Sequence, residues 1–211
     1  MPTRAPLLLA RLYPIVDLRP GRAPATLALA RVLVEAGAPW LQLRAKDLPD
    51  ATFLEVAREI VQLAATGGSR VVVNDRCDVC LLAGAAGVHL GQEDLPVPEA
   101  RRILGEHAVI GVSTHDEAEA RRAEAEGADY VGFGAIYRTA SKTDASPPRG
   151  PGALAAIRRA VRLPIVAIGG IDVDRADEVL AAGADAVAMI GALESAPDPA
   201  ALVRRWAAAR A

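Results

Sequence analysis

The sequence EGADYV (126–131) is one of four similar segments that decide the fold. The other three are AGAPWL (36–41), AGAAGV (83–88) and AGADAV (182–187). In each segment a glycine follows a helix-forming stretch and precedes a short apolar run. Glycine readily adopts the left-handed conformation that ends a helix, so each segment predicts a helix end followed by a buried strand.

Four further apolar runs lie between these segments, at 12–16, 71–73, 108–112 and 164–168. The intervals carry helical patterns near 24–36, 50–66, 76–83, 96–105, 115–126, 150–161, 172–182 and 197–209. Strands that are apolar throughout are typical of parallel pairing. Eight strand–helix units therefore predict an α/β protein, a single-domain (β/α)8 TIM barrel over residues 1–211. A doubly wound open sheet is the alternative, but no glycine-rich dinucleotide fingerprint follows the first strand.

Composition excludes several classes of protein. Hydrophobic residues make up 52% of the 211 and charged residues 24%, which excludes a disordered chain. The net charge of −2 argues against a nucleic-acid or anionic-membrane surface. Because no apolar run approaches membrane-spanning length and no export signal is visible, we expect a cytoplasmic protein. We expect its partners to be small molecules, and a homo-oligomer is left open. Cys77 and Cys80 are expected to pack in a core.

Lysine and asparagine are scarce in this arginine-rich chain. Of 24 basic residues only Lys46 and Lys142 are lysines, and Asn74 is the only asparagine. All three follow the carboxyl ends of predicted strands, which is the end where barrel enzymes carry their chemistry. The composition indicates a background bias that replaces lysine and asparagine wherever another residue serves. The positions that keep them are therefore candidates for a functional role, and for the lysines we expect contacts with phosphate.

Other polar and glycine residues fall at the same end. Gly169-Gly170 and Gly191 follow the seventh and eighth strands, where this fold binds phosphate, although a tight turn is the simpler interpretation. Asp75 and Asp94 follow neighbouring strands and suit Mg²⁺, with helix capping as the equal alternative. His89 is expected to pack within its strand. No Ser-His-Asp arrangement is visible, so the site favours charge neutralisation over proton abstraction.

These motifs resemble the thiamine phosphate synthase family from Leu12 to about Leu193. The resemblance rests on five blocks: LQLRAKD (41–47), VNDR (73–76), GVHLGQEDLP (87–96), GVSTH (111–115), and GFG (132–134) through TASK (139–142). The family condenses 4-amino-2-methyl-5-(diphosphooxymethyl)pyrimidine with thiazole phosphate and releases diphosphate. The resemblance implies a dissociative mechanism assisted by Mg²⁺.

The resemblance also implies roles for individual residues. The pyrimidine diphosphate would be held by Gln42, Arg44, Lys46, Asn74, Ser113 and Lys142. The thiazole phosphate would be held by Thr139, Ser141, Gly170, Ile190 and Gly191. Asp75 and Asp94 would bind Mg²⁺, and Lys46, Lys142 and Ser113 would act in catalysis.

The sequence departs from the family pattern at three positions. Ala45, Ala135 and Gly191 stand where the family usually has Glu, Pro and Ser. One alternative function is a thiazole tautomerase-like isomerase, but such relatives lack the metal aspartates and typically carry His at position 135. A non-catalytic regulator that binds thiazole phosphate is a second alternative, and it would need no Mg²⁺ site.

Overall fold

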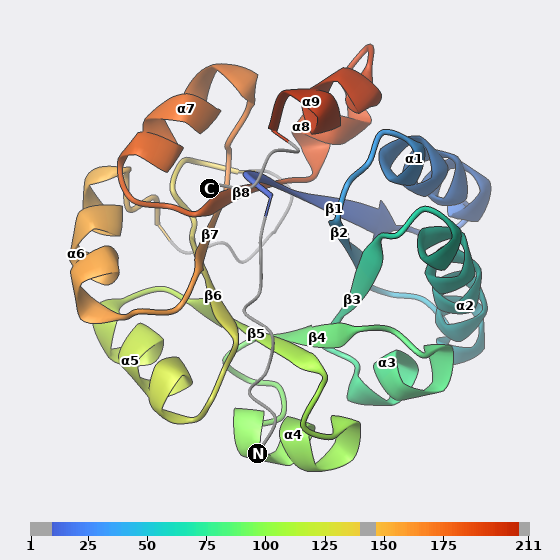
Figure 1. The fold of residues 1–211 in the computed structure, drawn as a ribbon, viewed down its shortest axis with the longest axis horizontal. Coiled ribbons are helices and arrows are strands. Elements are labelled where there is room, and N and C mark those ends of the chain that lie inside the picture. Colours follow the sequence, from blue (N-terminus) through green and yellow to red (C-terminus); the bar gives the residue numbers. More distant parts are fainter. Residues whose placement is uncertain (1–9, 140–146, 207–211) are drawn as a thin grey trace.

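The strands close into a barrel in which each one pairs in parallel with its neighbours in sequence (Figure 1). The computed structural model describes residues 10–139 and 147–206. The strands are β1 (Leu12–Leu18), β2 (Trp40–Ala45), β3 (Arg70–Asn74), β4 (Gly87–Leu90), β5 (Val109–Thr114), β6 (Tyr130–Gly134), β7 (Ile165–Ile168) and β8 (Ala186–Met189). The predicted (β/α)8 barrel is confirmed.

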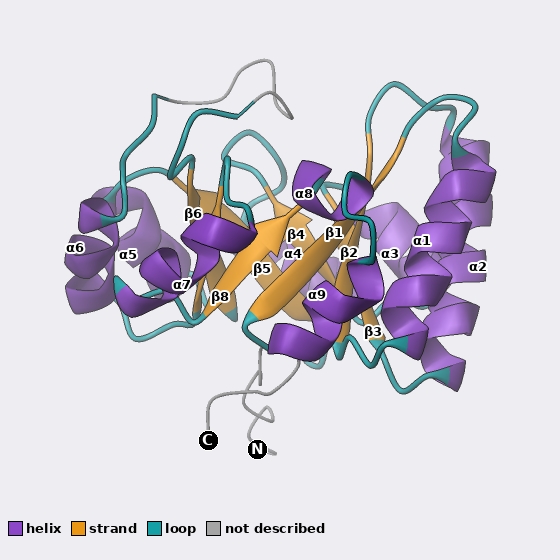
Figure 2. Cartoon of the chain, turned by 90° about the horizontal axis from the view of Figure 1, so that it is seen from above, coloured by secondary structure: helices purple, strands orange, loops and turns teal. Residues whose placement is uncertain are grey.

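Helices surround the barrel and flank the strands in the side view (Figure 2). They are α1 (Ala23–Glu35), α2 (Asp50–Thr66), α3 (Cys77–Ala83), α4 (Val97–Leu104), α5 (Glu117–Ala125), α6 (Gly152–Ala160), α7 (Val173–Ala181), α8 (Gly191–Glu194) and α9 (Pro199–Trp206). The sequence did not predict α8, because four residues are too few to show a helical period. The chain contains no helix, within the described residues, that is long and apolar enough to cross a membrane.

The four glycines that ended the predicted helices have positive φ angles. These are 88° at Gly37, 69° at Gly84, 88° at Gly127 and 118° at Gly183. At two of the four segments an aspartate two residues after the glycine accepts a hydrogen bond from the backbone of the neighbouring strand, and we call this contact an aspartate clamp. Asp129 Oδ2 accepts from the Ile110 amide of β5 at 2.8 Å, and Asp185 Oδ2 accepts from the Ile165 amide of β7 at 2.8 Å.

An arginine also contacts each aspartate, and it comes from the helix that precedes the hydrogen-bonded strand, α4 before β5 and α6 before β7. Arg101 Nη2 of α4 lies 2.8 Å from Asp129, and Arg158 Nη1 of α6 lies 2.9 Å from Asp185. The same arrangement therefore occurs twice at the amino end of the barrel, once before β6 and once before β8.

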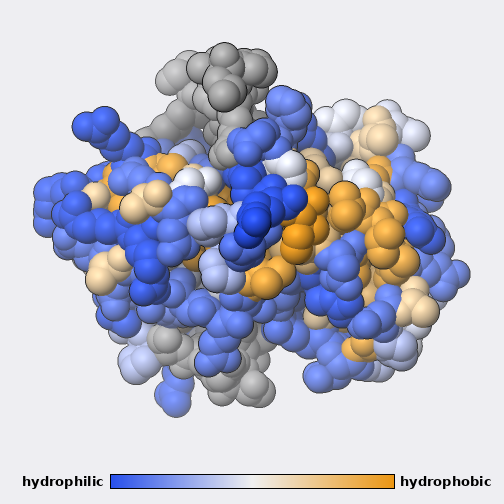
Figure 3. All heavy atoms as spheres, turned by 90° about the horizontal axis from the view of Figure 1, so that it is seen from below, coloured by the Kyte–Doolittle hydropathy of each residue, from blue (hydrophilic) through white to orange (hydrophobic). Residues whose placement is uncertain are grey.

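The apolar core has two parts. The larger fills the space between barrel and helices, and it includes Cys77 and Cys80, whose predicted core packing is confirmed. The smaller lies inside the barrel and contains Tyr13, Trp40 and Tyr130 with aliphatic side chains. The outer surface carries exposed Leu81 and Leu82 of α3, Ile103 of α4 and Leu95 before it. Figure 3 shows apolar side chains gathered on the face where these helices lie.

Candidate active site

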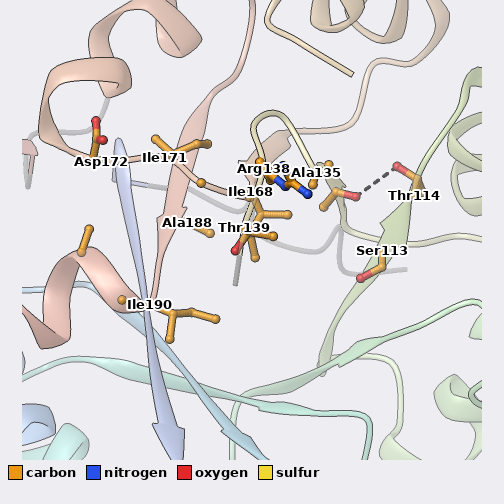
Figure 4. A pocket seen from close by; sticks show the side chains of 16 residues that line it. Ser113, Thr114, Ala135, Arg138, Thr139, Ile168, Ile171, Asp172, Ala188 and Ile190 are labelled. Carbon is orange, nitrogen blue, oxygen red and sulfur yellow. Dashed lines mark hydrogen bonds between the residues drawn. The ribbon is translucent and has the colours of Figure 1, made fainter. Parts of the chain in front are cut away.

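A cavity of about 310 Å³ lies at the carboxyl ends of β5 to β8. We call it the outer lobe. Much of its wall is backbone, because Gly132, Gly134, Gly169, Gly170 and Gly191 all line it. Figure 4 shows Ser113 and Thr114 on one side of this cavity and Ile171, Asp172 and Ile190 on the other. Two of the residues expected to hold thiazole phosphate, Thr139 and Ile190, line it as well.

A smaller cavity of about 30 Å³ extends into the mouth of the barrel, and we call it the inner lobe. Its lining contains four of the six residues expected to hold the pyrimidine diphosphate, Gln42, Arg44, Asn74 and Ser113, together with His89. Ser113, Gly132, Ile168, Ala188 and Ile190 line both lobes. The two lobes are therefore adjoining parts of one site, with Ser113 at their junction.

Arg44 enters the inner lobe from the end of β2 and is held by Asp17 of β1. Arg44 Nη1 lies 2.6 Å from Asp17 Oδ1, and Arg19 Nε lies 3.0 Å from the other carboxylate oxygen. The Arg44 side chain is 12% exposed, and its buried Nε has no hydrogen-bond partner within the described part of the chain. Since buried donors are normally paired, this N–H suits an anionic ligand.

Two carboxylates and a lysine meet at the ends of β2, β3 and β4. Lys46 Nζ lies 2.6 Å from Asp75 Oδ2, and Asp94 Oδ2 accepts from the Gly91 amide at 2.6 Å. Burial raises the pKa of Asp94, and the nearby Asp75 carboxylate adds to that rise. Two carboxylates placed this close together are the kind of site that a divalent cation stabilises.

The helix-capping interpretation of these aspartates is wrong. The N-cap of α3 is Arg76 and that of α4 is Pro96, and neither makes a side-chain capping bond. Asp75 itself adopts a left-handed φ of 65°, which is uncommon for a residue other than glycine. The described residues contain no group of three or more His, Cys, Asp or Glu suited to a metal ion. A cation held here by Asp75 and Asp94 would therefore complete its shell with water and substrate oxygens.

Ser113 on β5 has a fixed partner in His89 on β4. Ser113 Oγ lies 2.9 Å from His89 Nε2, and His89 Nδ1 lies 2.9 Å from the Tyr130 hydroxyl. The expected packing of His89 inside its strand is confirmed, since it is 9% exposed. Sequence reasoning missed that both ring nitrogens carry hydrogen bonds. The other histidine at this end, His115, contacts Glu119 at 3.0 Å.

Two of the expected site residues, Ser141 and Lys142, lie outside the described residues. Arg138, which the sequence analysis did not single out, lines the outer lobe beside Thr139 (Figure 4). An arginine in the same loop as the TASK block was the available signal. Tyr13 and Tyr130 were also missed, because nothing in their local sequence shows that they face the barrel interior.

A closed parallel barrel with a two-lobed cavity at the carboxyl ends of its strands, lined by apolar surface and a few polar groups, defines a (β/α)8-barrel enzyme. Residues 12–193 match the family model described as thiamine monophosphate synthase, and the chain belongs to this family. It is an enzyme of the transferase class.

Individual relatives agree with this assignment. The thiamine-phosphate synthase of Moorella thermoacetica is 47% identical over 194 residues, covering 92% of each chain. That of Anaeromyxobacter dehalogenans is 51% identical over 182 residues, covering 86% of this chain and 82% of the relative. The solved structure of thiamine phosphate pyrophosphorylase from Pyrococcus furiosus superposes with a TM-score of 0.83 at 36% identity and covers 94% of both chains.

Proposed function

We propose that this enzyme makes thiamine phosphate from 4-amino-2-methyl-5-(diphosphooxymethyl)pyrimidine and thiazole phosphate, releasing diphosphate. The observation that carries the proposal is the cluster of Lys46, Asp75 and Asp94, which follows β2, β3 and β4, the same strands that supply polar side chains to the inner lobe. A two-lobed site suits two substrates. The aspartate pair also favours a synthase over an isomerase or a regulator, which would need no cation.

The pyrimidine diphosphate occupies the inner lobe in this proposal. Arg44 supports the assignment, since its buried Nε lacks a partner in the described structure and its charge is already oriented by Asp17. Gln42 and Asn74 are both buried there and offer amide groups to the pyrimidine ring. Lys46 and Lys142 contribute further positive charge to the diphosphate.

Asp75 and Asp94 hold Mg²⁺ in this proposal. Their fit rests on the chemistry of the donors, because carboxylate oxygens are the ligands that a hard dication prefers, and burial together with the nearby Asp75 raises the pKa of Asp94. Mg²⁺ bound there supplies charge neutralisation of the leaving diphosphate. Lys46, which contacts Asp75 at 2.6 Å, lies where it can turn from that carboxylate to a diphosphate oxygen.

The thiazole phosphate occupies the outer lobe. Gly170 and Gly191 offer backbone N–H groups at the ends of β7 and β8, and Arg138 offers a guanidinium. Gly170 must be small, because a Cβ there would overlap the Arg138 carbonyl oxygen. Thr139 and Ser141 add hydroxyl groups from the loop after β6.

The reaction proceeds by dissociation in this proposal. The bond between the pyrimidine methylene carbon and the diphosphate oxygen breaks, and its electron pair leaves with the diphosphate. The pyrimidine amino group delocalises the resulting cation, and the thiazole nitrogen supplies the electron pair for the new C–N bond. No proton has to be abstracted, which agrees with a site rich in cations and backbone donors.

The test is the reaction itself, carried out with the purified protein, both substrates and Mg²⁺. We expect thiamine phosphate and diphosphate in equal amounts, measured by chromatography and a coupled diphosphate assay. Calorimetric titrations of each substrate provide the control for binding. Folded protein that binds both substrates and yields no product would refute the proposal.

A further inference from the structure

Two arginines share one buried carboxylate at the carboxyl ends of β1 and β2. Asp17 is the partner of Arg44 in the register of these strands, so their side chains are neighbours. Arg44 Nη1 lies 2.6 Å from Asp17 Oδ1, and Arg19 Nε lies 3.0 Å from Asp17 Oδ2. Each carboxylate oxygen has its own guanidinium partner, so the carboxylate cannot turn without losing a charge-assisted hydrogen bond.

Arg19 is itself anchored on α8. Its Nη2 lies 3.2 Å from Glu194 Oε2 and 3.4 Å from Glu194 Oε1, and Glu194 is the last residue of that helix. The exposed fraction of the side chains rises outward along these contacts, from 6% at Asp17 to 32% at Glu194 and 53% at Arg19. The contact between Asp17 and Arg44 is therefore the one that solvent screens least.

The contact with Asp17 uses only one end of the Arg44 guanidinium. Nη1 lies on the side of the group opposite the Nε–H, so the ion pair does not occupy the edge that carries Nε. Nε is buried without a hydrogen-bond partner among the described residues, and Arg44 lines the inner lobe. A guanidinium edge can donate two parallel hydrogen bonds to a phosphate group, and this geometry is specific. Asp17 therefore holds Arg44 by the end that an anion does not need.

A carboxylate beside an anion site needs an explanation, because its negative charge repels a diphosphate. Arg44, Asp17 and Arg19 together carry one net positive charge, whereas the two arginines without Asp17 would carry two. An arginine without a fixed partner samples many rotamers, however, and the entropy lost when a ligand orders it weakens binding. The charge of Asp17 and the order that it imposes on Arg44 therefore act on anion affinity in opposite directions.

We propose that Asp17 and Arg19 are positioning residues that hold Arg44 for the diphosphate group of the pyrimidine substrate, and that this ordering outweighs the repulsion between Asp17 and the diphosphate. Asp17 fixes Arg44 directly, and Arg19 fixes the second oxygen of Asp17. The inference rests on the proposed function for the identity of the ligand. The two can fail separately, because inorganic diphosphate probes the positioning of Arg44 without any reaction.

Calorimetric titration of Asp17→Asn with inorganic diphosphate and Mg²⁺ tests the proposal by the sign of the change. The variant keeps the size of the side chain and makes the site more positive by one charge. We expect the Kd for diphosphate to rise about tenfold, because Arg44 loses its charged partner. Asp177→Asn is the matched control and should leave the Kd unchanged, since Asp177 on α7 also pairs with an arginine but is 61% exposed. An equal or lower Kd for Asp17→Asn would overturn the proposal.

A double variant keeps the test decisive if Asp17→Asn does not fold, since a buried charge that has lost its partner is destabilising. Arg44→Gln combined with Asp17→Asn removes both charges together, and thermal melting checks the fold of each variant. We expect the double variant to bind diphosphate at least as tightly as Arg44→Gln alone, because Asp17 acts through Arg44. Weaker binding by the double variant would show that Asp17 acts by another route and would refute the positioning role.

Steady-state kinetics with each substrate varied in turn separate positioning from general damage to the fold. We expect Asp17→Asn to raise the KM for the pyrimidine diphosphate about tenfold and that for thiazole phosphate about twofold or less. Arg19→Gln should raise the first of these KM values about two- to fivefold, because Arg19 is half exposed and contacts Asp17 instead of Arg44. Equal increases for both substrates would overturn the proposal.

The failure of this inference and that of the proposed function give different results. Product formation by an Asp17→Asn variant that binds diphosphate as tightly as the unaltered protein would leave the proposed function intact and refute the positioning role. An unaltered protein that forms no product, but whose diphosphate binding is weakened about tenfold by Asp17→Asn, would refute the proposed function and support the positioning role.

Discussion

The two lobes of the site are lined in different ways. The inner lobe presents side chains from the ends of β1 to β5, among them Arg44, Asn74 and Ser113. The outer lobe has five glycines among its lining residues. Charge in the inner lobe is carried by groups that a single substitution can remove. Since glycines line the outer lobe, the substitutions expected to disturb it are those that add atoms.

Asp75→Ala gives the largest expected effect and tests the inner lobe. Loss of a proposed metal ligand should lower kcat/KM on the order of a hundredfold or more, and should raise the Mg²⁺ concentration needed for half-maximal rate. Glu99→Gln, an exposed carboxylate on α4, is the matched control and should change neither quantity. An unaltered Mg²⁺ titration for Asp75→Ala would remove this residue from the metal site.

Lys142→Arg tests whether the loop after β6 contributes a residue to the diphosphate site in the inner lobe. The resemblance assigns this lysine to the diphosphate, although its loop also carries Thr139 of the outer lobe. A guanidinium is larger and differently shaped than an ammonium group, so kcat should fall about tenfold or more despite the retained charge. Arg204→Lys on the exposed surface of α9 is the control. A wild-type rate for Lys142→Arg would contradict the inference drawn from lysine scarcity.

Gly170→Ala tests the outer lobe by adding one carbon. Gly170 has a φ of 62°, and the new Cβ would overlap the Arg138 carbonyl oxygen. We expect the KM for thiazole phosphate to rise about tenfold, with a smaller change for the pyrimidine diphosphate. Gly127→Ala controls for backbone strain, since Gly127 has a φ of 88° and open space around it, at the far end of β6. Equal changes for both substrates would erase the distinction between the lobes.

Gly191→Ser gives the smallest expected effect and is a second test of the difference between the inner and the outer lobe. It restores the hydroxyl that the family usually has at this position beside the outer lobe. One additional neutral hydrogen bond should lower the KM for thiazole phosphate about two- to fivefold and leave the Mg²⁺ titration unchanged. Steady-state kinetics with each substrate varied in turn would measure this. A higher KM would show that the outer lobe has no room for the hydroxyl.

The sequence predicted the barrel well because local signals repeat along it. Each helix end at Gly37, Gly84, Gly127 and Gly183 is a local event, and the strand that follows needs no knowledge of its partner. The same logic located Lys46, Asp75 and Asp94, since the end of a parallel strand can be found without knowing the register. The sequence could not decide between metal binding and capping, because that depends on backbone angles at Arg76 and Pro96.

What the sequence could not predict lies in contacts across the barrel. The hydrogen bond between Tyr13 and Tyr130 joins residues 117 positions apart, on strands that are not neighbours in the sheet. Whether His89 is a passive core residue or an orienting partner depends on that contact. The partner of Arg44 is a similar case, since its pairing with Asp17 depends on the register of β1 against β2.

The aspartate clamps at Asp129 and Asp185 give the amino end of the barrel its own means of cohesion. Each joins an adjacent strand and a helix of the preceding unit, so β5–β6 and β7–β8 resemble two copies of one module. The aspartate hydrogen bonds that hold each module together lie at the end of the barrel opposite the cavity. Such an arrangement leaves the loops at the other end free to diversify without loss of the scaffold, which is the condition under which one barrel can acquire new chemistry.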